Sequence, residues 1–439
     1  MAVTETGGID DTPPGLTPMR RLRAILGGSA GNLVEWYDWS AYLSFTLYFA
    51  SHFFPEGDQT AQLLKAAAVS AVGFLARPLG AWLMGTYADR SGRRAALTLS
   101  VSLMCLGSLI IALAPTYAQV GALAPAILLG ARILQGLSVG GEYGASATYL
   151  SEMATRERRG FWSSFQYVTL IAGQLLALGL LVLLQQTMDK ADLAAWGWRI
   201  PFFIGAGLAV VVFWLRRGIE ESRGFEAAKA SGAVRGSALQ LFLRHPKQTL
   251  MVMGLTAGGS LAYYVYTSYM QKFLVNTSGF SKSAATELMA WALLCFMLLQ
   301  PLFGWLSDKV GRKPMLLFAY TGGMVATWPL MTAISGTNQA WAAFGLIMIA
   351  LTIQSGYSSI SGVFKAEMFP AHVRALGVAL PYALANAVFG GTAEYVALWF
   401  KAAGMESGFY IYTSVILAVG LVVVILLPDP RRHSLITED

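Results

Sequence analysis

The chain has 439 residues, of which 55% are hydrophobic and only 13% are charged. Soluble globular proteins carry roughly a quarter charged residues, so this composition excludes an ordinary soluble enzyme. The net charge of +7 does not indicate a nucleic-acid-binding protein, because the basic residues lie in short loops beside apolar stretches. The two cysteines, Cys105 and Cys295, form no metal-binding pattern, and we expect no metal ion or other cofactor.

The chain is predicted to begin with a cytoplasmic tail at 1–22, which is polar and has no apolar core ahead of a cleavage site. Apolar stretches of about 20 residues, long enough to cross a bilayer, then follow one another. Gly, Pro and charged residues divide them. They predict a first set of six spans, near residues 24–50, 61–85, 95–114, 123–151, 161–187 and 198–215.

A polar stretch at 218–246 follows and is predicted to be a cytoplasmic linker. A second set of six spans is predicted near residues 248–275, 284–306, 314–334, 339–366, 373–399 and 408–427. The predicted fold class is therefore an all-α integral membrane protein with twelve transmembrane helices. Its two six-helix halves would cover 23–217 and 247–427, with a tail at 428–439.

The distribution of lysine and arginine predicts the orientation. These residues are concentrated in the tails, the linker and alternate loops, whereas the opposite loops contain only Lys65, Lys190, Lys272, Lys282 and Lys401. Cytoplasmic loops carry the excess of basic residues in membrane proteins. Both termini are therefore predicted to be cytoplasmic, and lipid surrounds the spans.

Two loop motifs occur twice in the chain. The sequence G-T-Y-A-D-R-S-G-R-R at 85–94 matches G-W-L-S-D-K-V-G-R-K at 304–313, which lies 219 positions later. A Glu-Met pair followed by Arg, seven positions after the Glu, occurs at 152–159 and again at 367–374, 215 positions later. Two motifs that recur in order at nearly one offset indicate a duplicated six-helix unit, as in transporters built from repeats.

At these motifs the chain resembles the major facilitator superfamily, whose loop signature G-x-x-x-D-[RK]-x-G-[RK]-[RK] fits residues 85–94. Within it, the chain resembles the metabolite:proton symporter family through N-L-V-E-W-Y-D at 32–38, W-G-W-R-I-P at 196–201 and A-E-M-F-P at 366–370. L-S-V-G-G-E-Y-G-A-S-A-T-Y at 137–149 and Y-M-Q-K at 269–272 are similar to the 2-oxoglutarate (α-ketoglutarate) permeases of that family. One departure is Ser91, where those permeases have histidine.

The resemblance implies a role for the charged residues of the repeated loops. Topology alone explains the basic residues among them but not the acids at fixed spacing. In this family such residues form networks between helices that hold the outward-open state. The resemblance assigns this gating role to Asp89, Arg93, Glu152, Arg159, Asp308, Arg312, Glu367 and Arg374.

Two arginines are predicted to contact an anionic substrate. Arg77 lies 12 residues before Asp89 in the second span, about 18 Å from its end at 1.5 Å per residue, and a guanidinium at that depth needs a polar cavity or a partner. The parallel N–H groups of the guanidinium suit a carboxylate, although a structural ion pair would also explain an arginine at this depth. Arg199 directly follows Trp196 and Trp198 at the outer start of the sixth span, where snorkelling is the alternative.

Acids at mid-membrane depth are predicted to carry protons. Glu35 and Asp38 lie roughly 18 to 22 Å from the cytoplasmic end of the first span. A carboxyl group removed from water binds a proton more readily, and the alternative is a salt bridge to Arg77 or Arg132. Arg132 and Glu142 share one face of the fourth span, and the run R-I-L-Q-G at 132–136 resembles a motif of proton-coupled members. An internal ion-pair network is the alternative for this pair.

Other polar residues of the second half are candidates for substrate contact. Tyr263 and Tyr266 form a semi-polar stripe in the seventh span, which an interfacial aromatic belt would explain equally well. Lys365 ends a polar stripe in the tenth span, where snorkelling to the cytoplasmic boundary is the favoured interpretation. Glu394 lies in a stripe of the eleventh span that suits helix packing as well as a ligand.

Buried cations, buried acids and the resemblance together predict a proton-coupled symporter that imports a small dicarboxylate, with 2-oxoglutarate first among substrates. Its partners would be the anionic metabolite and protons, in the cytoplasmic membrane of a bacterium, with the transporter as a monomer. The alternative within the family is symport of another organic acid or a zwitterionic osmolyte. A membrane-embedded enzyme or sensor is the remote alternative, because no catalytic motif and no intramembrane histidine were found.

Overall fold

The computed structural model describes residues 18–91, 93–139, 143, 147–148, 150–151, 154–216, 238–429 and 434–436. Two residues with predicted roles, Glu142 and Glu152, lie outside this part of the chain. For Asp89 and Arg93 the helical backbone is described but the side chains are not.

The predicted spans of the first half coincide with helices. Long apolar segments favour helix because a helix satisfies its backbone hydrogen bonds internally. The long helices are α1 (Pro18–Phe53), α2 (Gln59–Ser91), α3 (Arg93–Leu113), α5 (Leu123–Val139), α8 (Phe165–Thr187) and α10 (Ile200–Arg216). Short helices connect them: α4 (Tyr117–Val120), η1 (Arg156–Arg158), α7 (Arg159–Ser163), α9 (Lys190–Ala195) and η2 (Gly197–Arg199).

The predicted spans of the second half coincide with helices as well. The uninterrupted ones are α15 (Lys282–Val310), α16 (Arg312–Ser335) and α21 (Glu406–Leu426). The tenth span consists of α17 (Ala340–Ser358) and α18 (Ser361–Ala366), and α12 (Ala238–Arg244) precedes the seventh. The seventh and eleventh spans each contain a π-helical turn. The seventh consists of α13 (Pro246–Tyr264), the π-helical turn η3 (Val265–Tyr269) and α14 (Met270–Asn276). The eleventh consists of α19 (Ala371–Ala385), the π-helical turn η4 (Asn386–Gly390) and α20 (Ala393–Ala402).

The outer surface of the bundle is apolar. Among the described residues, seven helices are long and apolar enough to cross a membrane, and shorter apolar helices lie at Leu99–Leu113, Leu123–Ser138 and Gly197–Val211. Trp341, Leu298 and Leu426 expose 66 to 78% of their surface. Soluble proteins rarely expose apolar side chains in contiguous patches, so this surface suits contact with lipid.

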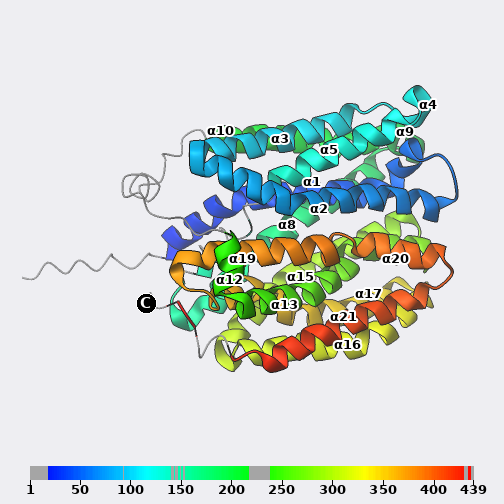
Figure 1. Ribbon diagram of the computed structural model, residues 1–439. Helices are drawn as coiled ribbons and strands as arrows, with labels where there is room; N and C mark the ends of the chain where they lie inside the picture. Colours follow the sequence, from blue (N-terminus) through cyan, green and yellow to red (C-terminus); the bar gives the residue numbers. More distant parts are fainter. Residues whose placement is uncertain are drawn as a thin grey trace, which may run out of the picture.

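The helices of the first half lie side by side, and those of the second half form a second group against them (Figure 1). The groups meet where α8 packs on α15 and where α2 packs on α20. One end of the bundle carries the repeated loop motifs and is named the motif end; the other is named the far end. The division into domains at 23–217 and 247–427 remains a prediction.

Close backbone approach fixes the first group. A Cβ on Gly136 of α5 would lie 2.0 Å from the Gly73 carbonyl oxygen of α2, so only glycine fits there. The same helices approach again where a Cβ on Gly80 would lie 2.3 Å from the Leu137 carbonyl oxygen. Small residues permit such approach between membrane helices. This packing brings the polar residues of α2 and α5 together.

Candidate functional site

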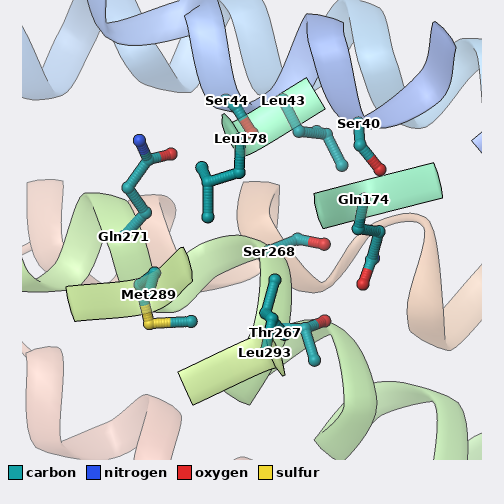
Figure 2. A pocket seen from close by; sticks show the side chains of 10 residues that line it. All are labelled: Ser40, Leu43, Ser44, Gln174, Leu178, Thr267, Ser268, Gln271, Met289 and Leu293. Carbon is teal, nitrogen blue, oxygen red and sulfur yellow. The ribbon is translucent and has the colours of Figure 1, made fainter. Parts of the chain in front are cut away.

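A small cavity lies between the two groups of helices (Figure 2). Its volume is about 20 Å³, enough for about one water molecule. Both halves line it: Ser40, Leu43, Ser44, Gln174 and Leu178 come from the first, and Thr267, Ser268, Gln271, Met289 and Leu293 from the second. The π-helical turn η3 provides Thr267 and Ser268, and such turns are frequent at functional sites.

Asp38 lies in a polar network inside the first half. Its carboxylate accepts hydrogen bonds from the Ser108 hydroxyl and from the Gln135 amide nitrogen, the latter at 2.5 Å. The Gln135 amide oxygen in turn accepts a bond from Arg132 at 2.8 Å. Gln135 therefore links the acid to the cation. Among the described residues, Asp38 and Arg132 form no direct ion pair, which was the alternative for Asp38.

Two arginines enclose one tryptophan in the same region. The Arg132 guanidinium carbon lies 3.6 Å from the ring centroid of Trp39, and that of Arg77 lies 4.1 Å from it. Phe74 is 4.2 Å from Arg77, and Tyr42 is 4.2 Å from Arg132. Aromatic faces attract cations, most strongly where water is excluded. The rings thus stabilise two buried guanidinium groups.

Arg77 is buried, with 6% of its surface exposed. Its Nε and Nη2 atoms have no hydrogen-bond acceptor in the part of the chain that the structure describes. A buried donor without an acceptor costs free energy, and such donors are therefore rare in native structures. The structural ion pair that was the alternative for Arg77 is not found among the described residues. Glu35, one turn before Asp38 on α1, is also buried.

Lys365 is a third buried cation, and here the favoured interpretation was wrong. Snorkelling requires an exposed ammonium group, whereas the side chain of Lys365 is fully buried. Its Nζ donates to the Ser361 hydroxyl at 2.8 Å and to the Tyr143 hydroxyl at 3.1 Å. The ring of Tyr382 lies 4.4 Å away and stacks on Tyr143. Tyr143 belongs to the first half, so Lys365 lies at the seam between the halves.

The two tyrosines of the seventh span point to different places. The Tyr263 hydroxyl donates to the side-chain oxygen of Gln174 at 2.9 Å, which joins the halves beside the central cavity. The Tyr266 hydroxyl donates to Thr327 at 2.8 Å and therefore points into the second half. Of the two hydroxyls, that of Tyr263 is thus hydrogen-bonded to a residue that lines the cavity.

Arg199 lies apart from the other predicted cations. Its Nη1 atom donates to the Ala112 carbonyl oxygen at 2.7 Å, near the carboxyl end of α3. Cations stabilise helix carboxyl ends, where carbonyls lack helical partners. The side chain also covers the Trp198 ring, at 4.3 Å. This geometry favours a structural role, and an anion contact at Arg199 remains an untested prediction.

The position of Lys272 and its pairing with Glu394 were missed. Lys272 was expected in a loop of the far end, but it lies in α14, fully buried, and binds both carboxylate oxygens of Glu394 on α20 at 2.7 Å. The apolar residues around Lys272 gave the only signal for burial. The cavity residues Gln174 and Gln271 were missed too, because single polar residues in apolar helices do not reveal which helices will meet.

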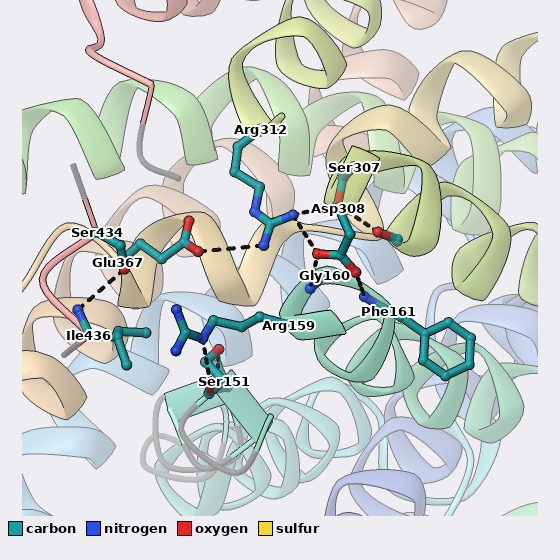
Figure 3. Close-up of polar contacts among 12 residues, drawn as sticks. Ser151, Arg159, Gly160, Phe161, Ser307, Asp308, Arg312, Glu367, Ser434 and Ile436 are labelled. Carbon is teal, nitrogen blue, oxygen red and sulfur yellow. Dashed lines mark hydrogen bonds and ion pairs between the residues drawn. The ribbon is translucent and has the colours of Figure 1, made fainter. Parts of the chain in front are cut away.

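At the motif end, Asp308 joins the two halves (Figure 3). Its two oxygens accept hydrogen bonds from the backbone nitrogens of Gly160 and Phe161, at 2.8 and 2.9 Å. A helix amino end favours a carboxylate. Arg312 donates to Asp308 at 2.8 Å and lies 3.5 Å from an oxygen of Glu367. The second copy of the loop motif thus forms a network between helices.

Two further members of the network, Arg159 and Arg374, donate hydrogen bonds to backbone carbonyl oxygens. Arg159 donates to the Ser151 carbonyl oxygen at 3.2 Å. Arg374 donates to the carbonyl oxygens of Phe369 and Leu435, at 3.1 and 2.9 Å. Burial raises the pKa of the Glu367 carboxyl above its ordinary value, although the nearby Arg312 acts in the opposite direction.

The halves are in contact at both ends of the central cavity. At the far end, Asn276 donates to Thr60 at 3.2 Å, and Lys282 donates to the Leu47 carbonyl oxygen at 2.6 Å. At the motif end, Asp308 and the stacked rings of Tyr143 and Tyr382 close the seam. The described residues of the two halves are therefore in contact on both sides of the cavity, as expected of an occluded conformation.

Comparison with known proteins identifies the family. A model described as the Major Facilitator Superfamily matches residues 29–393. The chain belongs to the major facilitator superfamily. It is 53% identical to an alpha-ketoglutarate permease of Escherichia coli over 93% of this chain and 94% of that protein. It is 32% identical to a citrate-proton symporter of Klebsiella pneumoniae over 84% of this chain and 83% of that protein.

Solved structures show the same fold. The xylose transporter XylE of Escherichia coli, in a partially occluded inward-open conformation, superposes with a TM-score of 0.74. The match covers 93% of this chain and 98% of that one at 21% identity. The predicted family and twelve-helix fold are therefore confirmed, and so is the expectation of a multi-pass membrane transporter rather than an enzyme. The permease and the symporter are named for organic acids, and the symporter also for protons; the similarity of none of these proteins tests the role of an individual residue.

Proposed function

We propose that this transporter imports a small dicarboxylate together with protons, with 2-oxoglutarate as the preferred substrate. The observation that carries the proposal is Arg77, a buried guanidinium with two donors that have no acceptor among the described residues. A carboxylate would accept from both donors of the fork at once. The 53% identity to an alpha-ketoglutarate permease supports the choice of acid.

A second cation suits the second carboxylate of such a substrate. Lys365 is buried, and its partners among the described residues are hydroxyls and aromatic rings rather than an acid. Arg77 belongs to the first half and Lys365 to the second. A dicarboxylate bound to both would stabilise the state in which the halves approach each other, because a ligand favours the state that it contacts better. Tyr263, which joins the halves beside the cavity, would contribute a hydroxyl.

Asp38 is proposed as the proton acceptor, with Gln135 as the link to Arg132. A change in the charge of Asp38 can affect Arg132 through the Gln135 amide, because this amide is hydrogen-bonded to both groups. Glu35 and Glu142 are proposed as further proton sites. Importing a dianion against an inside-negative potential costs about 2.3 kcal/mol per charge per 100 mV, and accompanying protons offset this cost.

The proposed topology places the motif end, both termini and the linker in the cytoplasm, as the basic loops indicate. Asp89, Arg93, Glu152, Arg159, Asp308, Arg312, Glu367 and Arg374 would then hold the cytoplasmic side closed when the outer side opens. We propose that the protein works as a monomer in the lipid of the bacterial cytoplasmic membrane and binds no nucleic acid.

Uptake by purified protein in proteoliposomes tests this function. We expect labelled 2-oxoglutarate to accumulate under an inward-directed proton gradient and to leak out after addition of a protonophore. Accumulation that survives collapse of both the pH gradient and the membrane potential would refute proton coupling. If citrate, shikimate or betaine accumulated far better under the same gradient, the substrate would be wrong and the coupling would stand.

A further inference from the structure

The carboxyl-terminal segment Ser434–Ile436 lies against the seam between the halves at the motif end. The backbone nitrogen of Leu435 donates to the Glu367 carbonyl oxygen at 2.9 Å. The Leu435 carbonyl oxygen accepts a bond from Arg374, also at 2.9 Å. Both Glu367 and Arg374 belong to the repeated loop motif, so the segment binds the charged network itself. Figure 3 shows Ser434 and Ile436 beside Glu367.

Ile436 is the apolar anchor of this segment. Only 5% of its surface is exposed, and it belongs to a buried cluster with Ala147, Ala366 and Val378. Tyr143 packs against the same cluster. Ala147 and Tyr143 come from the first half, whereas Ala366 and Val378 come from the second. One side chain of the tail therefore completes an apolar cluster to which both halves contribute.

The position of this cluster connects it to the transport pathway. Tyr143 stacks on Tyr382 across the seam and accepts a hydrogen bond from Lys365. Opening the motif end must separate Tyr143 from Tyr382 and divide the cluster around Ile436. The apolar surface on both sides would then lose the contact that Ile436 provides in the closed state.

We propose that residues 434–436 act as a latch that holds the motif end closed, and so favours the occluded and outward-open states. The latch acts through two backbone hydrogen bonds and one buried side chain, and it does not depend on which acid is transported. Release of the tail by a partner or by modification would favour the state open at the motif end. The tail thereby becomes a point at which transport can be regulated.

Adjacent residues of the tail offer a matched pair of variants. Ile436→Ser removes the buried side chain, whereas Leu435→Ser alters a neighbouring side chain that is 44% exposed and keeps both backbone bonds. The reporter is a cysteine at Ser163, which is buried at the seam close to Gly362. It is introduced after Cys105 and Cys295 have been replaced by serine. A membrane-impermeant maleimide applied to the motif end measures opening.

Burial of an aliphatic side chain contributes enough to shift a two-state equilibrium roughly tenfold. We expect Ile436→Ser to raise the labelling rate of the reporter about tenfold and Leu435→Ser to leave it unchanged. Ile436→Leu, which restores apolar volume, should return the rate toward that of the parent. A chain ending at residue 433 should label at least as fast as Ile436→Ser.

Three outcomes would overturn the latch. Labelling could be unchanged in the chain ending at residue 433, which lacks every latch contact. Leu435→Ser and Ile436→Ser could accelerate labelling equally, which would indicate general disturbance of the tail. Ile436→Ser could lower the thermal unfolding temperature and raise the labelling rate, while the chain ending at residue 433 shows neither change. This result would indicate a packing defect caused by the serine.

Discussion

At the scale of single residues, three buried charges decide how the site is interpreted. Within the part of the chain that the structure describes, Arg77 has two donors without acceptors, Lys365 has hydroxyl and aromatic partners, and Asp38 accepts hydrogen bonds from the neutral side chains of Ser108 and Gln135. A buried charge is costly unless hydrogen bonds or a counterion compensate it. This cost is the physical basis of the proposal that each cation binds a carboxylate of the substrate and that Asp38 binds a proton.

Replacing Arg77 by lysine tests the carboxylate contact. Arg77→Lys keeps the charge but loses the planar fork, and loss of one charge-assisted hydrogen bond costs about 1.5–3 kcal/mol. We expect 2-oxoglutarate to bind purified protein at least tenfold more weakly, as measured by calorimetry in detergent. Arg199→Lys is the matched control, because Arg199 binds backbone near the end of α3. Equal losses in both variants would contradict the assignment.

Replacing Asp38 by asparagine separates binding from coupling. The amide imitates the protonated acid in shape and lack of charge, so substrate binding and counterflow exchange should persist. Accumulation driven by a proton gradient should be lost, because no proton leaves or enters the site. Asp192→Asn, at an exposed position, should transport normally. Uphill accumulation by Asp38→Asn would show that another group, such as Glu35 or Glu142, carries the proton.

At the scale of helices, glycine positions determine which faces meet. Gly136 lies against the Gly73 carbonyl oxygen, and this contact lets Gln135, its neighbour in sequence, reach Asp38. Gly136 belongs to a set of glycines spaced by four on the fourth span, a spacing that permits close helix packing, and its approach to Gly73 is a contact of this kind. Gly140 and Gly144 lie outside the described residues.

A methyl group tests this packing. Gly136→Ala would place Cβ 2.0 Å from a backbone oxygen, and overpacking of this kind costs typically about 1–3 kcal/mol. We expect a lower thermal unfolding temperature in detergent. Gly130→Ala, on the same helix, meets no atom within 4 Å and should be neutral or stabilising by up to about 1 kcal/mol. Similar unfolding temperatures for both variants would mean that α2 and α5 can separate at little cost.

At the scale of the whole molecule, transport requires the halves to separate at one end at a time. The far end is held by Asn276 and Lys282, and the motif end by Asp308 and the tail. Both sets of contacts are present together, which is the condition for an occluded state. Which set breaks first depends on small differences in free energy, since each contact contributes only about 1–3 kcal/mol.

Weakening Asp308 should open the motif end. In Asp308→Asn, the amide oxygen can still accept a hydrogen bond from one of the backbone nitrogens of Gly160 and Phe161, but the amide NH2 group faces the other nitrogen. The ion pair with Arg312 is lost as well. We expect faster labelling of a cysteine at Ser163 from that side, while the protein stays in the membrane. Asp189→Asn, exposed near the far end, should have no effect. Unchanged labelling in Asp308→Asn would indicate that the motif serves topology alone.

The sequence by itself determined the number and length of the spans, the duplication and the family. These properties depend on local features: hydrophobic length set by the bilayer, loop charge, and motifs that recur at a fixed offset. For the same reason, it identified Arg77, Asp38 and Arg132 as costly groups at mid-membrane depth. Each of these inferences needs only the residue and its distance along one helix.

Only the tertiary structure decided which partner each buried group meets. Lys365 is packed between aromatic rings of both halves instead of reaching solvent, and Lys272 pairs with Glu394 from a helix more than a hundred residues away. Gln135 was known as part of a motif, yet its position between Asp38 and Arg132 depends on how α1, α3 and α5 pack. Such contacts arise from helix rotation and close approach, which no periodicity along one segment encodes.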